Sequence, residues 1–548
     1  MWGLPAVGAL LLLAGAVVAG VLLSNAGGRS VHVPAPPTAA GAPTADVGGV
    51  PGSGGVSATS PARSSGSDPP VIVSVSDRSV GKPIPSGFLG FSFEFSAVRT
   101  YTGTDPRQIN PVLIQLIRNL TPGQAPVLRI GGDSTDGSYV PAPGVRPPAY
   151  VRYRLTPGWM ATTSALAKTL GARLILGLNL QADEPALAVA EGRAFVKAFG
   201  AGAIDALEIG NEPNVYRKAI VYHTVFGAPV PARPKNFGYP AFRRQFDAIA
   251  AASPPLALAG PALAIGPNPG SGSWVQTIPS FLRRQPRVGI MTVHRYPLRN
   301  CYVPPRSPQY PTVSHLLSSY ATEELAASLK RWVEIAHAQH RQLRVDELNS
   351  VACRGKVGVS DTFASALWAT DALFSLARVG VDGINVHTLP NAAYELFQFS
   401  HAGGRWQGTV RPVYYGLQLF AQAAPASSQL LRVSRHGPDA GLSAWATRAP
   451  DHVTRVVLIN KNQTHSRTVR IPVPAGSPST ATVERMAAPS VKSNSGVTLG
   501  GRTYGAVTAT GRLATPVVSR LRAAHDQVTL SVPHGSAALV TFGAPSAG

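Results

Sequence analysis

Short apolar segments, each ended by Gly, Pro, Asn or a polar residue, recur along the chain between residues 87 and 390. They occupy residues 87–95, 126–134, 172–180, 206–213, 256–264, 288–297, 342–350 and 383–390. Nearly continuous apolar runs are typical of parallel strands whose two faces are both covered by other elements. The pattern therefore predicts eight buried parallel strands.

Helix-length amphipathic segments fill the intervals between these runs. Examples are residues 110–120, 158–171, 241–252 and 323–340. Eight strand–helix units in succession predict an α/β fold, a (β/α)8 TIM barrel over residues 85–407.

Beyond residue 408 the pattern changes to short alternating strands separated by clusters of turn residues, as in "TRVVLINKN" and "QVTLSVPHGSAALVTFGA". This alternation is typical of a β-sandwich. We expect a C-terminal antiparallel β-sandwich over residues 408–548. Residues 70–84 contain one further strand-like stretch, "PVIVSVSDR", which is expected to pair with that sandwich.

The first 69 residues differ from the rest of the chain. Residues 1–26 are apolar from Trp2 to Leu23 and end in small residues of the kind that signal peptidase recognises, so we interpret them as a signal peptide or an uncleaved membrane anchor. Residues 27–69 are rich in Ala, Gly, Pro and Ser and are expected to form a disordered linker. Both interpretations place the remaining chain outside the cytoplasm, secreted or attached to the membrane.

The chain is strongly basic. It has 49 Lys and Arg against 27 Asp and Glu, a formal net charge of +22. Such a charge attracts anionic polymers and surfaces. The basic residues are scattered, with no zinc-finger spacing and no aromatic RNA-binding signature, so nucleic acid is not an expected partner. A carbohydrate partner, including an acidic polysaccharide, fits the charge.

Two glutamates, Glu212 and Glu347, stand at the ends of the fourth and seventh predicted strands. The C-terminal strand ends of a barrel form its active-site face, and these strands lie on opposing parts of the ring, so both carboxylates can face one cleft. Glycoside hydrolysis needs such a pair: one acid protonates the leaving oxygen, and one carboxylate attacks or activates water. A helix cap or a surface ion pair could explain one such glutamate, but it explains two at corresponding strand ends less well.

The motifs around these glutamates resemble a known group of glycosidases. "EIGNEPNVY" and "DELNS" are similar to the clan whose catalytic glutamates lie on strands four and seven. The similarity extends through "GFLGFSFEFS", "LRIGGDSTDGSYV", "HRYP" and "GVSDTFASALWATDAL" to glycoside hydrolase family 79, which contains β-glucuronidases and heparanase. The resemblance covers residues 70–545.

The resemblance implies a retaining β-glycoside hydrolase of β-glucuronidase type, with Glu212 as acid/base and Glu347 as nucleophile of a double displacement. Retention requires carboxyl groups about 5–5.5 Å apart, against about 6.5–9.5 Å for inversion. No cofactor and no metal are expected. Two alternatives stay open: a glycosidase of the same clan that acts on xylosides, glucosides or arabinosides, and a catalytically silent carbohydrate-binding protein of the cell wall.

Three further residues are expected beside the catalytic pair because of their positions. Asn211 precedes Glu212 and is expected to hydrogen-bond the sugar 2-hydroxyl, unless it only closes an Asx turn. His294 and Tyr296 end the sixth strand, next to the seventh. The Tyr296 hydroxyl is expected to hold Glu347 in position, with simple packing as the alternative.

Acidic residues at the first two strands are also candidates. Glu94 resembles the family residue that binds hydroxyls of the terminal sugar, and its alternative role is an ion pair with a neighbouring Arg. Asp133 and Asp136 lie in a Gly-rich loop that contacts sugar or caps a helix. This loop lacks the Lys-Ser/Thr of a phosphate-binding loop.

The loop after the seventh strand carries the last candidates. Cys301 and Cys353 follow the sixth and seventh strands at the same face, and in an exported protein they are expected to form a disulfide rather than a metal site. In characterised glucuronidases of the family, a Tyr followed by small residues receives the uronate carboxylate here. This sequence has Ala352, Cys353 and Arg354 instead. We expect backbone N–H groups together with Arg354 to bind the carboxylate, or Arg354 to be a solvated loop residue.

Overall fold

The computed structural model describes residues 69–267, 269–270 and 272–543. The predicted signal segment and the predicted linker up to residue 68 lie outside these residues. In the part of the chain that the structure describes, no helix combines the length and the apolar character needed to cross a membrane.

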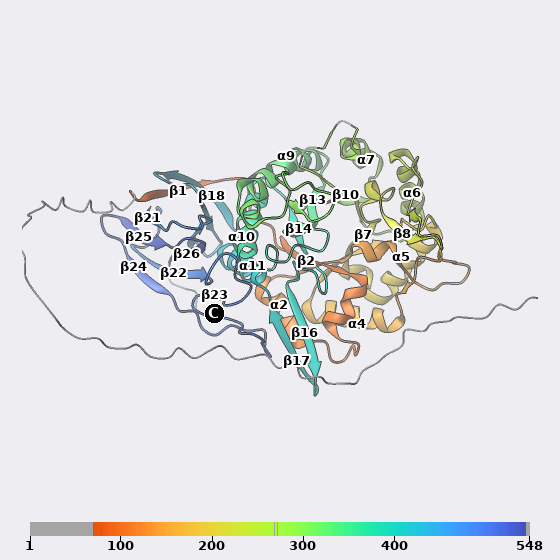
Figure 1. Cartoon of the computed structure of the whole chain (residues 1–548), viewed down its shortest axis with the longest axis horizontal. Coiled ribbons are helices and arrows are strands. Elements are labelled where there is room, and N and C mark those ends of the chain that lie inside the picture. Colours follow the sequence, from red (N-terminus) through yellow and green to blue (C-terminus); the bar gives the residue numbers. More distant parts are fainter. Residues whose placement is uncertain (1–68, 268, 271, 544–548) are drawn as a thin grey trace, which may run out of the picture. The chain divides into compact units, whose positions relative to one another are not determined.

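Eight parallel strands close into a barrel (Figure 1). They are β2 (Leu89–Glu94), β3 (Val127–Gly131), β6 (Arg173–Leu178), β7 (Ile204–Ile209), β10 (Leu258–Ala264), β11 (Val288–His294), β13 (Gln342–Leu348) and β15 (Gly383–Thr388). Each strand overlaps one of the eight predicted apolar runs, and the pairing of β15 with β2 closes the ring. The predicted (β/α)8 barrel is confirmed.

Helices cover the outside of the barrel. The longer ones are α2 (Pro111–Leu120), α4 (Pro157–Leu170), α5 (Pro185–Phe199), α6 (Tyr239–Ala252), α7 (Ile278–Arg284), α9 (Glu323–Ala338), α10 (Phe363–Arg378) and α11 (Pro412–Ala423). Pro stands in the first turn of most of them, where a missing N–H leaves no hydrogen bond unmade. α2 is also capped by the Asn110 side chain, which accepts hydrogen bonds from two N–H groups of the first turn.

Short elements follow several of the barrel strands, in the loops at their C-terminal ends. The short helices are α1 (Val98–Thr102), α3 (Asp133–Asp136) and α8 (Val313–Leu316). The two-stranded pairs are β4 (Ser138–Tyr139) with β5 (Tyr153–Arg154), β8 (Ile220–His223) with β9 (Pro229–Pro231), β12 (Leu298–Arg299) with β14 (Val351–Ala352), and β16 (Phe397–Ala402) with β17 (Arg405–Val410).

A ten-stranded, mostly antiparallel sheet makes up the C-terminal domain. Its strands are β1 (Val71–Ser79), β18 (Gln429–His436), β19 (Leu442–Arg448), β20 (Thr454–Asn460), β21 (Arg467–Pro472), β22 (Thr480–Ala487), β23 (Thr498–Leu499), β24 (Ser519–Arg522), β25 (Gln527–Val532) and β26 (Ser536–Phe542). The sheet folds over so that β25 contacts β20 and β26. As predicted, the N-terminal strand joins it: β1 is antiparallel to β18 (Figure 1) and parallel to β21.

The expected boundary between the two domains, at residues 407 and 408, falls within β17. The β16–β17 hairpin alternates in the manner of sandwich strands, but α11 follows it and packs on α10 and α2. This helix is the eighth of the barrel. The first strand of the sheet after it begins only at Gln429.

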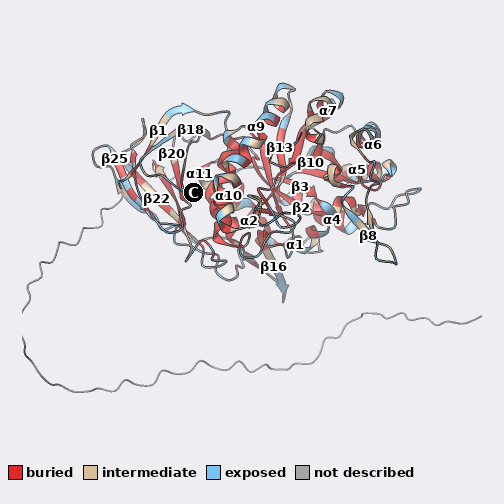
Figure 2. Cartoon of the chain, turned by 45° about the horizontal axis from the view of Figure 1, so that its top comes forward, coloured by how far each residue is buried: buried red, intermediate tan, exposed pale blue. Residues whose placement is uncertain are grey.

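Asp371 in α10 joins the two domains. Its carboxylate is fully buried and accepts hydrogen bonds from Lys461 Nζ at 2.6 Å, Trp445 Nε1 at 2.8 Å and Ser443 Oγ at 2.9 Å. A buried charge is tolerated when it is paired and its lone pairs are satisfied, as here. These contacts hold the sheet against α10, which is buried along nearly its whole length (Figure 2).

Candidate active site

A cavity of about 460 Å³ lies at the C-terminal end of the barrel strands. This is the end at which barrels carry their functional loops. The cavity brings together eight of the residues predicted from sequence: Glu94, Asp133, Glu212, His294, Tyr296, Glu347, Cys353 and Arg354. Residues that are separated by up to 260 positions in the chain therefore share one site.

Glu212 and Glu347 face each other in this cavity. A carboxylate oxygen of one lies within 4.8 Å of a carboxylate oxygen of the other. Glu347 belongs to β13, whereas Glu212 follows β7 by three residues and has a left-handed backbone conformation, with φ 49° and ψ 50°. Such a conformation costs a non-glycine residue on the order of 1–3 kcal/mol. It turns the chain out of the strand while the N–H of Glu212 donates to Ala262 O at 2.9 Å.

Both carboxylate oxygens of Glu347 accept hydrogen bonds. The Tyr296 hydroxyl donates to Oε1 at 2.9 Å, and Arg129 Nη1 donates to Oε2 at 2.8 Å. Burial raises the pKa of Glu347, but the positive charges of His294 and Arg129 outweigh it and hold the pKa well below its ordinary value. Glu347 is therefore ionised.

Arg129 is the central residue that the sequence motifs did not single out. Its guanidinium is completely buried and donates to Glu208 Oε2 at 2.8 Å, Glu347 Oε2 at 2.8 Å and Asn211 Oδ1 at 2.9 Å. A side chain at position 131 would collide with this guanidinium, so Gly131 leaves the room for it. The sequence feature that could have indicated Arg129 is its position as a single Arg in the otherwise apolar run "VLRIGG".

Two more buried acidic residues, Glu208 and Asp346, lie below Glu212 and Glu347. Arg129 Nε is 3.7 Å from Asp346 Oδ2. Burial and the neighbouring charge of Glu208 raise the pKa of Asp346 well above its ordinary value. Burial also opposes the charge on Glu208, but Arg129 outweighs it and keeps that pKa low. The pair thus consists of a carboxylate, Glu208, and a neutral acid, Asp346.

His294 connects this buried pair to Glu212. Its Nδ1 lies 3.0 Å from Glu212 Oε1, and its Nε2 lies 3.6 Å from Asp346 Oδ1. Burial lowers the pKa of His294, and so does the Arg129 guanidinium. The Glu347 carboxylate, and then the hydrogen bond to Glu212, raise it, to about 9 in all. The imidazolium can therefore donate to Glu212.

Glu94 is held by the Gly-rich loop after β3. Its carboxylate accepts the N–H groups of Asp133, at 3.1 Å, and Ser134, at 2.7 Å. Gly132 has φ 78°, and a Cβ there would collide with the Glu94 carboxylate, so only glycine lets the loop approach so closely. Burial, and then the charge of Asp133, raise the pKa of Glu94 to about 8. In the described chain, no arginine forms an ion pair with Glu94, the alternative expected from sequence; the ring of His387 lies beside it instead, with Nε2 3.6 Å from Glu94 Oε1.

The structure places the other two acidic candidates of this loop, Asp133 and Asp136, in different surroundings. Asp133 lines the cavity, and burial followed by the charges of Glu347 and Glu212 raises its pKa to about 6. Asp136 is buried away from the cavity lining, where it accepts a hydrogen bond from Tyr216 at 2.9 Å. Asn211 lies behind the lining, and its Nδ2 donates to Asp133 Oδ1 at 3.1 Å.

Two residues of the eighth strand and its loop complete the cavity. His387 is the penultimate residue of β15, and Tyr394 lies in the loop that follows this strand. Burial lowers the pKa of His387 to about 4, so its ring is neutral, with Nδ1 3.0 Å from Ser92 Oγ. The sequence did not identify His387 as a site residue, because a single His near the end of an apolar run such as "GINVHTLP" does not by itself indicate a functional role.

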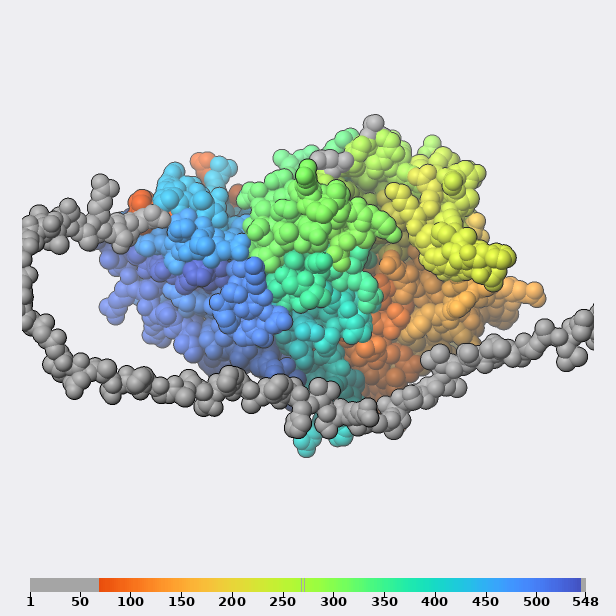
Figure 3. Space-filling model, in the orientation of Figure 1, coloured from red at the N-terminus to blue at the C-terminus, as the bar shows by residue number. Residues whose placement is uncertain are grey.

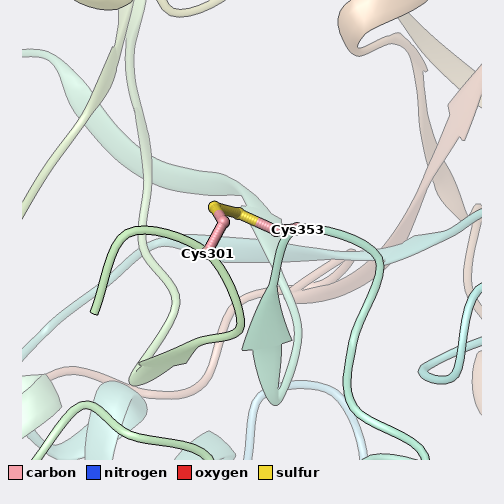
Figure 4. The surroundings of a disulfide bond; sticks show 2 residues. All are labelled: Cys301 and Cys353. Atoms are coloured by element: carbon pink, nitrogen blue, oxygen red, sulfur yellow. A yellow bond between two sulfur atoms is a disulfide. The ribbon is translucent and has the colours of Figure 1, made fainter. Parts of the chain in front are cut away.

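The loops after β11 and β13 are tied together at the mouth of the cavity. The predicted disulfide between Cys301 and Cys353 is present (Figure 4), with Cα atoms 6.0 Å apart. Cys353 and Arg354 have φ values of 64° and 66°, in the sparsely populated left-handed region. The Arg354 carbonyl accepts the N–H of Ala393 at 2.9 Å, and its guanidinium donates to Pro390 O at 3.2 Å. Arg299, at the end of β12, lines the same cavity.

Groups of carboxylates and histidine in the described residues come close enough to hold a metal ion. Glu212, His294 and Glu347 form one such group, and Glu208, His294 and Asp346 form another. Arg129 already places a positive charge between these groups through its contacts to Glu208 and Glu347. A second cation at this position would be repelled, so the geometry favours proton chemistry by a charge-balanced carboxylate pair.

Known proteins resemble the chain in sequence and in fold. Residues 444–539 match the family model described as the glycosyl hydrolase family 79 C-terminal beta domain. A β-glucuronidase of Neurospora crassa is 24% identical over 434 residues, which cover 71% of this chain and 74% of that protein.

Solved structures share the whole fold. A 4-O-α-L-rhamnosyl-β-D-glucuronidase from Fusarium oxysporum superposes with a TM-score of 0.68 at 19% identity, covering 86% of this chain and 100% of that one. A family 51 arabinofuranosidase from Xanthomonas axonopodis pv. citri gives a TM-score of 0.60 at 14% identity, over 86% and 100% of the two chains. At these identities the structural likeness establishes the architecture of barrel and sheet.

Proposed function

Because the chain belongs to glycoside hydrolase family 79, we propose that it is a retaining β-glucuronidase that removes a glucuronic acid-type sugar from a glycoconjugate or oligosaccharide. One observation carries the retaining mechanism: carboxylate oxygens of Glu212 and Glu347 lie within 4.8 Å. Retaining glycosidases hold their carboxyl groups about 5–5.5 Å apart, whereas inverting ones need about 6.5–9.5 Å to admit water.

In the first step, Glu347 attacks the anomeric carbon and Glu212 gives its proton to the leaving oxygen. Glu347 suits the role of nucleophile because Arg129 and Tyr296 hold its oxygens and keep it ionised. As the proton leaves Glu212, the imidazolium of His294, at 3.0 Å, stabilises the carboxylate that forms. The product of this step is a glycosyl ester on Glu347.

In the second step, water hydrolyses that ester. The Glu212 carboxylate now acts as base and takes the proton of the water, which attacks the anomeric carbon and releases Glu347. Asn211 supports both steps in this proposal: with its carbonyl held by Arg129 and its amide donating to Asp133, it is fixed beside the position of the sugar 2-hydroxyl.

The choice of a uronic acid rests on the polar groups around the catalytic pair. Arg354 lies on the loop next to the nucleophile and is exposed to the cavity, where it is available to pair with a carboxylate. Glu94, with a pKa of about 8, is protonated at neutral pH, so it can donate to a sugar hydroxyl without repelling the uronate. Both features suit an anionic sugar at the cleaved position.

Turnover of aryl β-glycosides tests this proposal. Wild type is expected to hydrolyse an aryl β-glucuronide in preference to the matching glucoside, xyloside and arabinoside. Glu347→Ala is expected to lose activity by about 10⁴-fold or more, as nucleophile removal does in other hydrolases. A preference for neutral glycosides, or activity that survives Glu347→Gln, would contradict it.

The acid/base role has its own signature. Glu212→Ala is expected to keep turnover of aryl glucuronides with good leaving groups, and added azide is expected to rescue it by forming the β-glycosyl azide. Asp136→Asn is a matched control, because Asp136 is buried nearby but does not line the cavity. If azide raised the rates of Glu212→Ala and Asp136→Asn equally, Glu212 would not be the acid/base.

We also propose that the enzyme works outside the cytoplasm. Both cysteines of the chain are joined in the disulfide at the cavity mouth, and such bonds persist in oxidising compartments. Mass spectrometry of the protein isolated from cell fractions under non-reducing conditions tests this. A reduced Cys301 and Cys353 in the cellular protein would contradict it.

A further inference from the structure

The most exposed apolar side chains of the described chain gather on the catalytic face. Four large hydrophobic residues are more than three-quarters exposed: Val225 and Phe226 at 94%, Tyr302 at 97% and Val357 at 77%. Val225 and Phe226 form the tip of the β8–β9 hairpin. Side chains of this kind are costly to leave in water, and contiguous exposed ones mark interaction surfaces.

Barrel topology places these residues on one face. The β8–β9 hairpin follows β7, Tyr302 follows β11 and Val357 follows β13, so each lies on a loop at a C-terminal strand end. The disulfide ties the second of these loops to the third. In Figure 3, the yellow residues that include the hairpin and the green residues that include Tyr302 both reach the surface of the face shown.

The same three loops carry almost only positive charge. Residues 213–238, 295–312 and 349–362 contain nine Lys and Arg and a single acid, Asp361. Arg233 and Arg295 are buried. The remaining cations are at the surface: Arg217, Lys218, Lys235, Arg299, Arg306, Arg354 and Lys356. Exposed apolar tips and surface cations thus lie together on three loops beside the cavity, and this surface is here called the basic apolar rim.

From this juxtaposition we infer that the basic apolar rim docks on an anionic lipid bilayer, with Val225, Phe226 and Tyr302 inserted at the headgroup level. Peripheral proteins bind such surfaces through apolar side chains that enter the interface and cations that meet the lipid phosphates. A soluble acidic polymer would satisfy the cations but leave the Val225–Phe226 tip in water. The inference does not depend on which sugar is cleaved. Docking in this orientation directs the cavity toward glycans that are presented at a membrane surface.

A spin label at the hairpin tip tests the docking in the full chain. The label is placed on Ala228→Cys, an exposed position beside Phe226. Its thiol is the single free one, because both native cysteines form the disulfide. Since the label reports on the hairpin itself, an apolar segment elsewhere in the chain cannot produce its signal.

On vesicles of phosphatidylcholine with phosphatidylglycerol, the label is expected to gain collisions with oxygen and lose collisions with a water-soluble nickel chelate. Vesicles of phosphatidylcholine alone are expected to leave it unchanged, and high salt is expected to reverse the effect. Val225→Ser with Phe226→Ser is expected to raise the anionic lipid concentration for half-maximal shielding about tenfold or more. Val517→Ser with Val518→Ser, an exposed apolar pair of the sheet domain, is the matched control and is expected to have no effect.

Three outcomes would overturn the inference. In the first, the nickel chelate still collides with the label when anionic vesicles are present. In the second, hyaluronan reduces these collisions but vesicles do not. In the third, a higher protein concentration alone reduces them. The last two would assign the rim to a polyanion or to a second copy of the chain. Hydrolysis of a soluble aryl glucuronide is measured beside these variants. Because the hairpin tip lies outside the cavity lining, that rate reports separately on the proposed activity.

Discussion

The interior of the barrel below the cavity and the interior of the sheet domain are both closed to water, yet they have opposite chemistry. The core of the sheet domain is built from aliphatic and aromatic side chains, such as Val456, Leu458 and Val469, and its completely buried polar residues, Thr454 and Asn460, are uncharged. The barrel encloses Arg129, Glu208, Asp346 and His294, all at most 1% exposed.

The difference shows what each interior is for. Burying charges costs more than burying apolar groups of the same size, and replacing a buried ion pair by apolar residues is often neutral or stabilising. The sheet interior therefore serves stability alone. The barrel interior maintains a set of charges and protons below Glu212 and Glu347, at the expense of stability.

The largest expected effect follows removal of the central cation. Arg129→Met leaves Glu208, Asp346 and Glu347 without their shared guanidinium, so the free energy of unfolding is expected to fall by about 3–5 kcal/mol. The kcat for an aryl glucuronide is expected to fall about 10²–10³-fold. The pKa of Glu347 is lowered in the wild type, so its loss of charge limits activity only at low pH. In the variant that acidic limb is expected to move to higher pH.

Denaturant unfolding and a pH–rate profile measure these effects. Arg129→Lys keeps the charge without the planar fork, and it is expected to recover part of the stability and little of kcat. A pH profile that is identical in Arg129→Met and the wild type would show that Arg129 does not control the ionisation of Glu347.

A change in the other interior is expected to affect stability alone. Leu458 is completely buried in β20, and Leu458→Ala is expected to lower the free energy of unfolding by about 2–5 kcal/mol through the cavity it leaves. Below the unfolding temperature, kcat is expected to be that of the wild type. A lower kcat in the folded variant would show that the two interiors are coupled through α10 and Asp371.

His294 gives the barrel a dependence of stability on pH. Its pKa is raised from 6.5 to about 9, so its contribution is complete below pH 6.5 and is lost as pH rises through about 9. Over this range the wild type is expected to lose up to about 3 kcal/mol more than His294→Gln. Unfolding curves recorded across the range for both proteins measure the difference. Parallel curves would mean that the ring is neutral in the folded protein.

The smallest effect is expected at Asp346. Because burial and Glu208 keep this acid protonated, Asp346→Asn replaces a neutral group by another of the same shape. The free energy of unfolding is expected to change by less than about 1 kcal/mol. Calorimetry or denaturant unfolding checks this. A loss of several kcal/mol would identify Asp346 as a buried carboxylate that Arg129 compensates.

Much of this architecture was accessible from sequence because strand patterns are local. Each barrel strand appears as its own apolar run, and the positions of Glu212 and Glu347 after two such runs place them at one end of the barrel. The disulfide followed from the same reasoning, since Cys301 and Cys353 follow adjacent strands. The motifs "EIGNEPNVY" and "DELNS" indicated the clan of glycosidases, and the further motifs, taken as a set, indicated the family.

The partners of the buried charges were not accessible in this way. Arg129 and Glu347 are 218 positions apart, and nothing in either segment specifies the other. Their contact depends on how the ring closes and on Gly131, which makes room for the guanidinium. Asp133 lies at the cavity and Asp136 behind it because they are the first and last residues of the short helix α3, which points their side chains in different directions.

By itself, the sequence determined the order of the elements, the two-domain plan and the pair of glutamates, because these depend on patterns within a few residues of each position. Only the tertiary structure decided which groups are charged: Glu347 ionised, Asp346 neutral, His294 protonated. Ionisation depends on burial and on charges a few ångströms away, and those neighbours come from strands that meet only when the barrel closes.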